Sequence, residues 1–199
     1  MQPVQPAEAP RRVALLGGES SGKTTLAIAL AQALGTVWVP EYGRQRWEEV
    51  RHTLSVDELV LVAQRQVALE VEAAIQVTAQ AGPRASTWLV CDTTPLTTLQ
   101  YCLHDHHHAP PALRTLAHRH YDLTVLCQPD FDFVQDGCRR DDDFRAAQHA
   151  WTLARLTEMG VVPLVVDGSV AHRVQQVLHH IQQLDAAPSA AVKQETSKQ

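Results

Sequence analysis

One eight-residue segment near the N-terminus combines residue types and a spacing that suit phosphate binding. It fits the pattern G-x-x-x-x-G-K-[ST] of a phosphate-binding loop, or P-loop, and reads Gly17-Gly18-Glu19-Ser20-Ser21-Gly22-Lys23-Thr24. The glycines let backbone N–H groups curl inward around an anion, and the Lys23 ammonium can reach the β- and γ-phosphates of a nucleoside triphosphate. We expect the Thr24 hydroxyl to bind Mg²⁺ and Thr25 to contact the α-phosphate. ATP and Mg²⁺ are therefore the predicted cofactors.

Lysine is rare in this chain, which makes the lysine of this segment informative. The chain has only three lysines among its 17 basic residues, and Lys23 is the only one in the first 192 residues. Codon composition explains why lysine is rare, but it does not explain why the remaining one lies here. A planar guanidinium does not replace a compact ammonium at this place, so the position is chemically constrained.

An acidic residue follows a buried-looking strand downstream of this loop. Asp92 ends the apolar run Trp88-Leu89-Val90-Cys91. In P-loop proteins an acid at such a strand end helps to hold Mg²⁺, and we expect this role for Asp92. A carboxylate that merely caps the strand is the alternative.

A second acid ends another predicted strand, in the segment Pro40-Glu41-Tyr42-Gly43-Arg44. In a phosphoryl-transfer enzyme this position faces the acceptor of the phosphoryl group. There Glu41 can accept the proton of an attacking hydroxyl, with Tyr42, Arg44 and Asp92 as further substrate-binding candidates. A surface glutamate paired with Arg44 or Arg46 is the alternative, and both interpretations remain open.

A charged segment, residues 137–145, follows the fourth predicted strand. We expect a lid that closes over the phosphates and brings Arg139 to the transferring group. The alternative is a solvated loop in which the acids neutralise the arginines; this alternative is stronger for Arg145 than for Arg139.

Apolar runs alternate with helical patterns along the rest of the chain. Strands are predicted at 13–16, 36–40, 87–91, 123–127 and 161–166. Helices are predicted at 26–34, at 146–159, at 170–184, and from the capping box of Ser55 and Glu58 to about residue 81, with Leu59, Val62, Val67, Val71 and Ala74 near one face. This alternation predicts an α/β fold of the P-loop NTPase type: a doubly wound parallel sheet of about five strands, with a short lid. Ligands bind such sheets beyond the carboxyl ends of the strands, where Glu41, Asp92 and the P-loop all fall.

Length and composition set limits on the class of protein. The 199 residues suit one domain at 11–185, with flexible tails at 1–10 and 186–199. The net charge of −5 gives no basic stripe for nucleic acid. No signal peptide and no membrane span are visible, so we expect a cytoplasmic protein without a membrane partner; homo-oligomerisation stays open. The four cysteines show no metal spacing, and Cys91 and Cys127 lie in apolar runs where a buried thiol is expected.

Two further groups of residues could take part in binding. The tract His104-Asp105-His106-His107-His108 has metal-binding residue types, but the prolines after it favour a polar loop. Trp38, Tyr42, Trp47 and Tyr101 lie near the predicted acceptor site, where one or two of them could stack on a heteroaromatic base.

Together these segments resemble the ribosylnicotinamide kinase domain of NadR-type proteins from about residue 11 to 183. The resemblance rests on the P-loop through Leu26, on Val39-Pro40-Glu41-Tyr42-Gly43-Arg44, on Asp92-Thr93-Thr94 with Thr97-Thr98, and on Pro129-Asp130 with Val134-Gln135-Asp136-Gly137 and Arg139. It implies a nucleoside/nucleotide-kinase-like enzyme that uses ATP to phosphorylate the 5′-hydroxyl of nicotinamide riboside in NAD salvage. By that analogy Lys23 and Thr24 serve ATP and Mg²⁺, Asp92 lies beside metal and acceptor, and Arg139 belongs to the lid.

The chain departs from that family in two respects. Thr94 stands where the family commonly has a second aspartate. The DNA-binding and adenylyltransferase domains of full-length NadR proteins have no counterpart in these residues, so we do not expect regulation of transcription or dinucleotide synthesis.

Other functions remain alternatives. The same fold class serves kinases for other nucleosides or nucleotides, and a regulatory P-loop NTPase is a further alternative from a different class. The chain contains no asparagine, so it cannot carry the Asn-Lys-x-Asp motif that reads guanine, nor the asparagine that binds Mg²⁺ in the catalytic loop of protein kinases.

Overall fold

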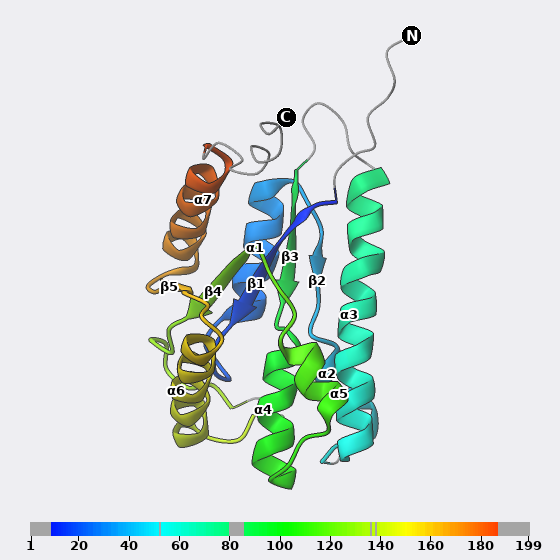
Figure 1. The fold of residues 1–199 in the computed structure, drawn as a ribbon. Coiled ribbons are helices and arrows are strands. Elements are labelled where there is room, and N and C mark those ends of the chain that lie inside the picture. The colour runs from blue at the N-terminus through cyan, green and yellow to red at the C-terminus, as the bar shows by residue number, and fades with distance from the viewer. Residues whose placement is uncertain (1–8, 52, 80–85, 136, 138, 187–199) are drawn as a thin grey trace, which may run out of the picture.

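A five-stranded parallel sheet forms the centre of the molecule. The computed structural model describes residues 9–51, 53–79, 86–135, 137 and 139–186. The strands lie in the order β2-β3-β1-β4-β5 (Figure 1), with bounds β1 Arg11–Leu16, β2 Trp38–Val39, β3 Trp88–Asp92, β4 Leu123–Cys127 and β5 Leu164–Val166. This arrangement confirms the predicted doubly wound α/β fold.

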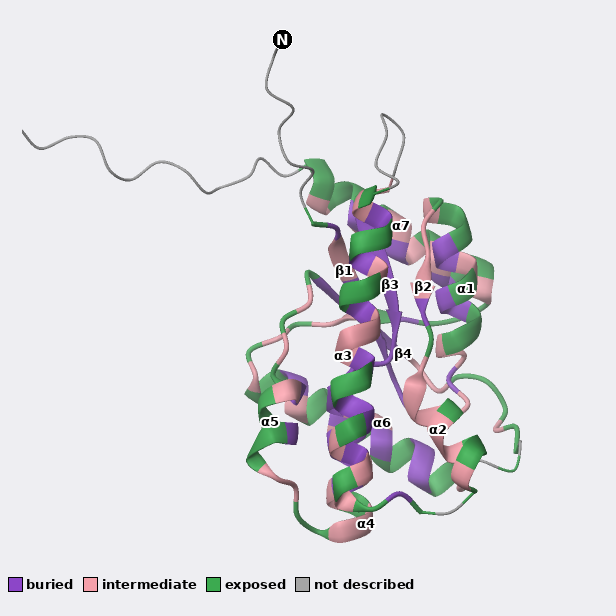
Figure 2. Ribbon diagram, turned by 90° about the vertical axis from the view of Figure 1, so that its right-hand side faces the viewer, coloured by how far each residue is buried: buried purple, intermediate pink, exposed green. Residues whose placement is uncertain are grey.

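Seven helices in the described residues cover both faces of the sheet. Their bounds are α1 Lys23–Leu34, α2 Tyr42–Val50, α3 Val56–Ala79, α4 Pro95–His106, α5 Pro111–Ala117, α6 Asp142–Glu158 and α7 Val170–Ala186. Helices α1 and α7 pack together on one face, and α3, α4, α5 and α6 pack on the other. Figure 2 shows α1 on one side of the sheet and α3 with α5 on the opposite side.

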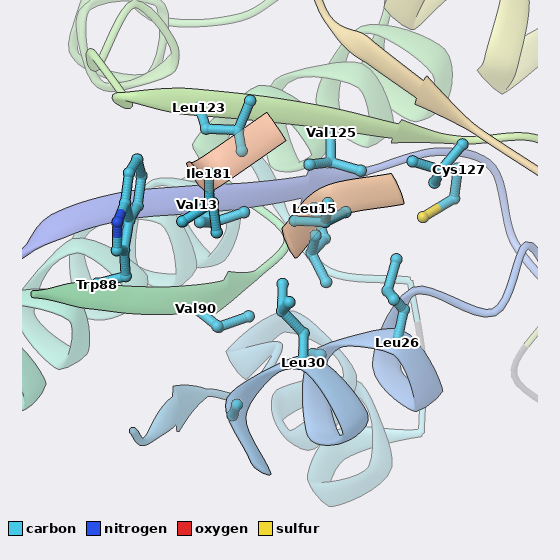
Figure 3. Close-up of a cluster of buried hydrophobic side chains, with 14 residues drawn as sticks. Val13, Leu15, Leu26, Leu30, Trp88, Val90, Leu123, Val125, Cys127 and Ile181 are labelled. Atoms are coloured by element: carbon cyan, nitrogen blue, oxygen red, sulfur yellow. The ribbon is translucent and has the colours of Figure 1, made fainter. Parts of the chain in front are cut away.

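Successive residues of the strands supply the two cores. In β1, Val13 and Leu15 point into the cluster under α1 and α7, whereas Leu16 joins the cluster under α3 to α6. The same alternation places Val125 in the first cluster and Leu126 in the second, since successive side chains of a strand point to opposite faces. Figure 3 shows the first cluster, with Leu26 and Leu30 of α1 reaching toward the sheet. The inner strands β1, β3 and β4 are thus buried on both faces, as their continuous apolar runs predict.

Two predicted helix signals are present as expected. Helix α1 ends at Gly35, which takes a left-handed conformation (φ 63°). The Ser55 backbone N–H donates to Glu58 Oε2 (2.9 Å), and the Glu58 N–H donates to Ser55 Oγ (3.3 Å), so the capping box closes in both directions.

Several predicted elements differ from the structure. Helices α2, α4 and α5 were not predicted, β2 has only two residues, and α6 begins at Asp142 instead of residue 146. In α3, Leu59, Val62 and Ala74 are buried, but Val71 is 44% exposed. Most of the predicted tails, Cys138, and the end of α3 predicted near residue 81 lie outside the described residues. No helix of the described part is long and apolar enough to cross a membrane.

Candidate active site

The P-loop joins β1 to α1, and its backbone carbonyl oxygens bind the ammonium group of Lys23. Gly17 (φ 143°) and Gly22 (φ 79°) have backbone conformations that L side chains rarely adopt. A side chain at Gly17 would also lie 2.8 Å from the Cys127 carbonyl oxygen. Lys23 Nζ donates to the carbonyl oxygens of Gly17 (3.0 Å) and Gly18 (2.8 Å), so the loop holds the ammonium in place.

Asp92 and Thr24 meet at the base of the loop. Asp92 is 1% exposed at the end of β3, and the Thr24 hydroxyl donates to its Oδ2 (2.6 Å). Asp92 Oδ1 is buried and has no hydrogen-bond partner in the described structure. Burial raises the pKa of Asp92, and the Thr24 hydrogen bond and the Lys23 charge oppose this shift. A hydroxyl and a carboxylate oxygen without a partner are hard ligands of the kind that Mg²⁺ prefers, so these two residues fit the predicted metal.

Glu41 lies at the end of β2 and precedes the first turn of α2. Desolvation raises its pKa above the ordinary value for glutamate, while the nearby positive charge of Lys23 opposes the rise and the negative charge of Asp92 adds to it. The carboxyl group of Glu41 is therefore in electrostatic contact with both the P-loop lysine and the second acid, as the strand-end argument predicts.

A cavity of about 210 Å³ at the carboxyl end of the sheet is lined by the P-loop and by Glu41. Of the predicted site residues, it is lined by Gly17, Glu19, Ser20, Ser21, Gly22, Lys23, Thr24, Thr25, Glu41, Arg44 and Arg139. Trp47 and Tyr101 also line it. Gly18, Tyr42 and Asp92 are not among its lining residues; Tyr42 packs against the hydrophobic cluster under α3 to α6, and Trp38 packs against the cluster on the other face.

Glu19 connects the P-loop to three other parts of the wall. Its carboxylate accepts hydrogen bonds from the Tyr101 hydroxyl of α4 (2.7 Å) and from the Arg140 backbone N–H (2.7 Å). Its own N–H donates to Gln148 Oε1 of α6 (2.8 Å). The P-loop pattern treats this position as variable, so sequence reasoning placed Glu19 in the loop without assigning it this role.

The lid prediction is only partly matched by the described residues. Arg139 and Arg140 of this segment line the cavity, and Val134, which precedes the segment, donates from its N–H to Ser20 Oγ of the P-loop (3.1 Å). Arg145, in contrast, belongs to the first turn of α6 and is 6% exposed. It donates to Asp142 and to the Phe131 carbonyl oxygen (2.7 Å), and is therefore a structural residue outside the lid.

Arg173 stabilises the P-loop by hydrogen bonding, and no local sequence pattern predicts this role. Its side chain is fully buried in α7 and donates to the carbonyl oxygens of Ser21 (2.7 Å) and Gly168 (3.0 Å). It also forms an ion pair with Asp130 and lies over the Phe131 ring, 4.4 Å from the centroid. One guanidinium thus joins the P-loop to the loops that follow β4 and β5.

The histidine tract is only partly a polar loop, because residues 104–106 end α4 whereas His107 and His108 follow it. His104 and His106 belong to the last turn of α4. The His104 ring packs edge-on against Phe144 (4.7 Å), whereas His106 Nε2 lies 2.8 Å from the Leu54 carbonyl oxygen. These histidines have separate partners, and the described residues contain no group of three potential ligands placed to hold a metal ion.

Comparison with families and curated proteins places this site among P-loop domains. A family model described as an AAA domain matches residues 12–173. The trifunctional NAD biosynthesis/regulator protein NadR of Salmonella typhimurium (strain LT2) is 33% identical over 130 residues. The matched region is 65% of this chain and 31% of that protein, so the chain spans less than a third of the length of this relative.

Solved structures with the same fold include kinases. A NadR protein in complex with NR superposes with a TM-score of 0.67 at 21% identity, over 94% of this chain and 54% of that one. A NadR protein with NAD and AMP-PNP gives 0.61 at 17% identity, over 94% and 52%. Thymidylate kinase from Candida albicans gives 0.59 at 14% identity, over 89% and 93%. The fold is that of P-loop nucleoside and nucleotide kinases.

Proposed function

We propose that this chain, which belongs to the AAA domain family of P-loop proteins, is an ATP-dependent kinase that phosphorylates the 5′-hydroxyl of nicotinamide riboside. The product is nicotinamide mononucleotide, and the reaction belongs to NAD salvage. The 33% identity to a NadR protein and the shared fold with a NadR protein in complex with NR, the common abbreviation of nicotinamide riboside, support this assignment.

The observation that carries the proposal is that Lys23 and Glu41 line one cavity. A P-loop lysine binds the phosphates of the donor. A carboxylate whose pKa is raised by burial can accept a proton from an alcohol within the same space. A regulatory NTPase that only signals which nucleotide it has bound does not need a base for an alcohol in the same cavity as the phosphates.

In the proposed reaction, the 5′-oxygen of the riboside attacks the γ-phosphorus of ATP. The bond between the γ-phosphorus and the β–γ bridging oxygen breaks, ADP leaves, and the hydroxyl proton passes to Glu41; Asp92 is the alternative base. Lys23 and the N–H groups of the P-loop hold the phosphates, and Arg139 neutralises charge on the transferring group. Thr24 and Asp92 would hold Mg²⁺, which would supply further charge neutralisation when bound.

A kinase for another nucleoside or nucleotide is the second candidate. The cavity wall also includes the apolar side chains of Trp47, Leu54 and Leu59, which suit a flat heteroaromatic base without selecting one. The similarity in fold to thymidylate kinase favours this candidate over a regulatory NTPase.

An ATP-consumption screen tests the proposal. The acceptors are nicotinamide riboside, purine and pyrimidine nucleosides, and their monophosphates. We expect nicotinamide riboside to give the highest turnover. If it gives none above the acceptor-free background, the proposed reaction is wrong; if no acceptor does, the regulatory NTPase becomes the better assignment.

A further inference from the structure

The buried face of α3 carries a glutamine at a place where an apolar residue would be expected. Gln66 lies one helical turn after Val62, on the same face, and both side chains line the cavity. Gln66 is only 1% exposed. A polar side chain is buried at a cost unless its hydrogen-bonding groups find partners, so the partners of Gln66 are informative.

One end of this amide has a partner and the other does not. The Tyr42 backbone N–H donates to Gln66 Oε1 (2.9 Å). This bond fixes the orientation of the amide, because the reverse orientation would place an NH₂ group against a backbone donor. Gln66 Nε2 is buried and has no hydrogen-bond partner among the described residues. An unpaired buried donor destabilises a fold, so the position of Gln66 Nε2 in a residue that lines the cavity suits it to bind a ligand there.

The unpaired donor lies at the Glu41 end of the cavity. Its amide is hydrogen-bonded to the residue directly after Glu41. At the neighbouring Gly43, a β-carbon would lie 3.5 Å from Val62 Cγ1 and 3.9 Å from Glu41 Oε1. The first turn of α2 and this turn of α3 therefore converge, and Gln66 lines the same cavity as Glu41, the proposed base.

We propose that Gln66 selects the acceptor by donating a hydrogen bond from Nε2 to an oxygen of the substrate. This inference rests on the proposed kinase function and deepens it. The ligand is a nucleoside-like molecule that offers an acceptor oxygen at this point, either a ribose hydroxyl or a carbonyl group of the base. Analogues that lack this oxygen are rejected because they leave the buried donor unpaired.

A substrate–variant cycle tests the proposal. The wild type and Gln66→Met are assayed with nicotinamide riboside, its 2′-deoxy and 3′-deoxy analogues, and the pyridine riboside that lacks the carboxamide. We expect one analogue to lower the wild-type kcat/KM by about 10-fold, mainly through KM, and to cause no further loss in Gln66→Met. The sensitive analogue distinguishes a sugar oxygen from a base oxygen.

Two further variants separate this role from a structural one. Gln64→Met changes an exposed glutamine on the same helix and should behave as the wild type. Gln66→Glu keeps the oxygen that accepts from the Tyr42 N–H but replaces Nε2 by oxygen, so we expect it to lose the discrimination; circular dichroism checks that each variant is folded before it is assayed. Equal losses for all four acceptors in the Gln66 variants would overturn the proposal.

Failure of the kinase assignment gives a different result. If the wild type turns over another nucleoside, the same cycle is run with the deoxy analogues of that substrate. If it turns over none, binding of the panel is measured by thermal shift. A panel member that stabilises the wild type but not Gln66→Met supports the role of Gln66, and a panel that does not bind at all overturns it together with the kinase.

Discussion

At the scale of single residues, the two carboxyl groups of the candidate site, those of Asp92 and Glu41, have different surroundings. Asp92 is held by the Thr24 hydroxyl at the base of the P-loop, whereas Glu41 lines the cavity. Both have pKa values raised by burial. The different contacts favour Asp92 for the proposed binding of Mg²⁺ and Glu41 for the proposed role of proton acceptor.

Replacing Glu41 by glutamine tests this division. We expect Glu41→Gln to lower kcat by ~10²–10⁴ and to leave ATP affinity near the wild-type value, because the phosphate-binding groups are unchanged. Steady-state kinetics and ATP titration measure the two effects. Glu48→Gln, an exposed change on α2, is the control. Near-normal turnover in Glu41→Gln would make Asp92 the better candidate for the base.

The same residue predicts a pH dependence. A base acts only when it is deprotonated, and the raised pKa of Glu41 extends its protonated form to higher pH. We therefore expect kcat/KM to fall as the pH decreases, with a midpoint above the range of an ordinary glutamate. The remaining activity of Glu41→Gln should lack this limb of the profile. A limb that persists in this variant would assign the titration to another group.

At the scale of elements, hydrogen bonds connect the P-loop to several helices. Glu19 ties it to α4, to α6 and to the backbone of Arg140, while Arg173 ties it to α7. The loop therefore depends on helices that are distant in the sequence.

The contribution of α7 can be measured directly. We expect Arg173→Met to lower the free energy of unfolding by about 2–3 kcal/mol, because it removes the ion pair with Asp130 and the hydrogen bonds to three carbonyl oxygens; the partial exposure of Asp130 reduces the loss. Urea denaturation gives the value. Arg65→Met removes an exposed ion pair with Glu72 and should change stability by less than about 0.5 kcal/mol. Equal effects in both variants would contradict the role of Arg173.

Local signals explain which elements sequence reasoning found. Strands β1, β3 and β4 are continuous apolar runs, and Ser55 with Glu58 forms a recognisable cap, so these elements could be predicted. Helix α2 has no buried residue, so no apolar face marks it. Helix α4 opens with a Thr94 cap and Pro95, but polar residues interrupt its buried face. In α3, valine periodicity favoured Val71, although the buried positions include the polar Gln66 and Glu70.

The site was predictable to the extent that it follows sheet topology. The carboxyl ends of parallel strands meet at one edge of the sheet, so the sequence alone predicted that Lys23, Glu41 and Asp92 lie near one another. Arg173 and Gln148 reach the loop from helices, and their contacts depend on tertiary packing that no short pattern encodes. Thr94 caps α4 by accepting from the Leu96 N–H (3.2 Å), a role that an aspartate could also fill.

At the scale of the whole molecule, nucleotide binding should stabilise the fold. ATP at 100 times its Kd adds about 2.7 kcal/mol, which raises Tm by roughly 5–10 °C for a chain of this size. We expect Lys23→Ala to abolish most of this rise at the same ATP concentration and to lose kinase activity, since the proposed role of the ammonium is to bind the phosphates. Differential scanning fluorimetry measures the shift. An unchanged shift, or retained activity, would contradict phosphate binding by this loop.

The wall around Glu41 comes from a short, continuous part of the chain. The end of β2, α2 and the first three turns of α3 supply Glu41, Gly43, Trp47, Val62 and Gln66, whereas the P-loop, Asp92 and Arg173 lie outside it. The proposed acceptor preference can therefore change by substitutions within residues 41–66, about one eighth of the 199-residue chain, while the P-loop stays unchanged. A graft of this stretch between related kinases is then a practical route to new substrates.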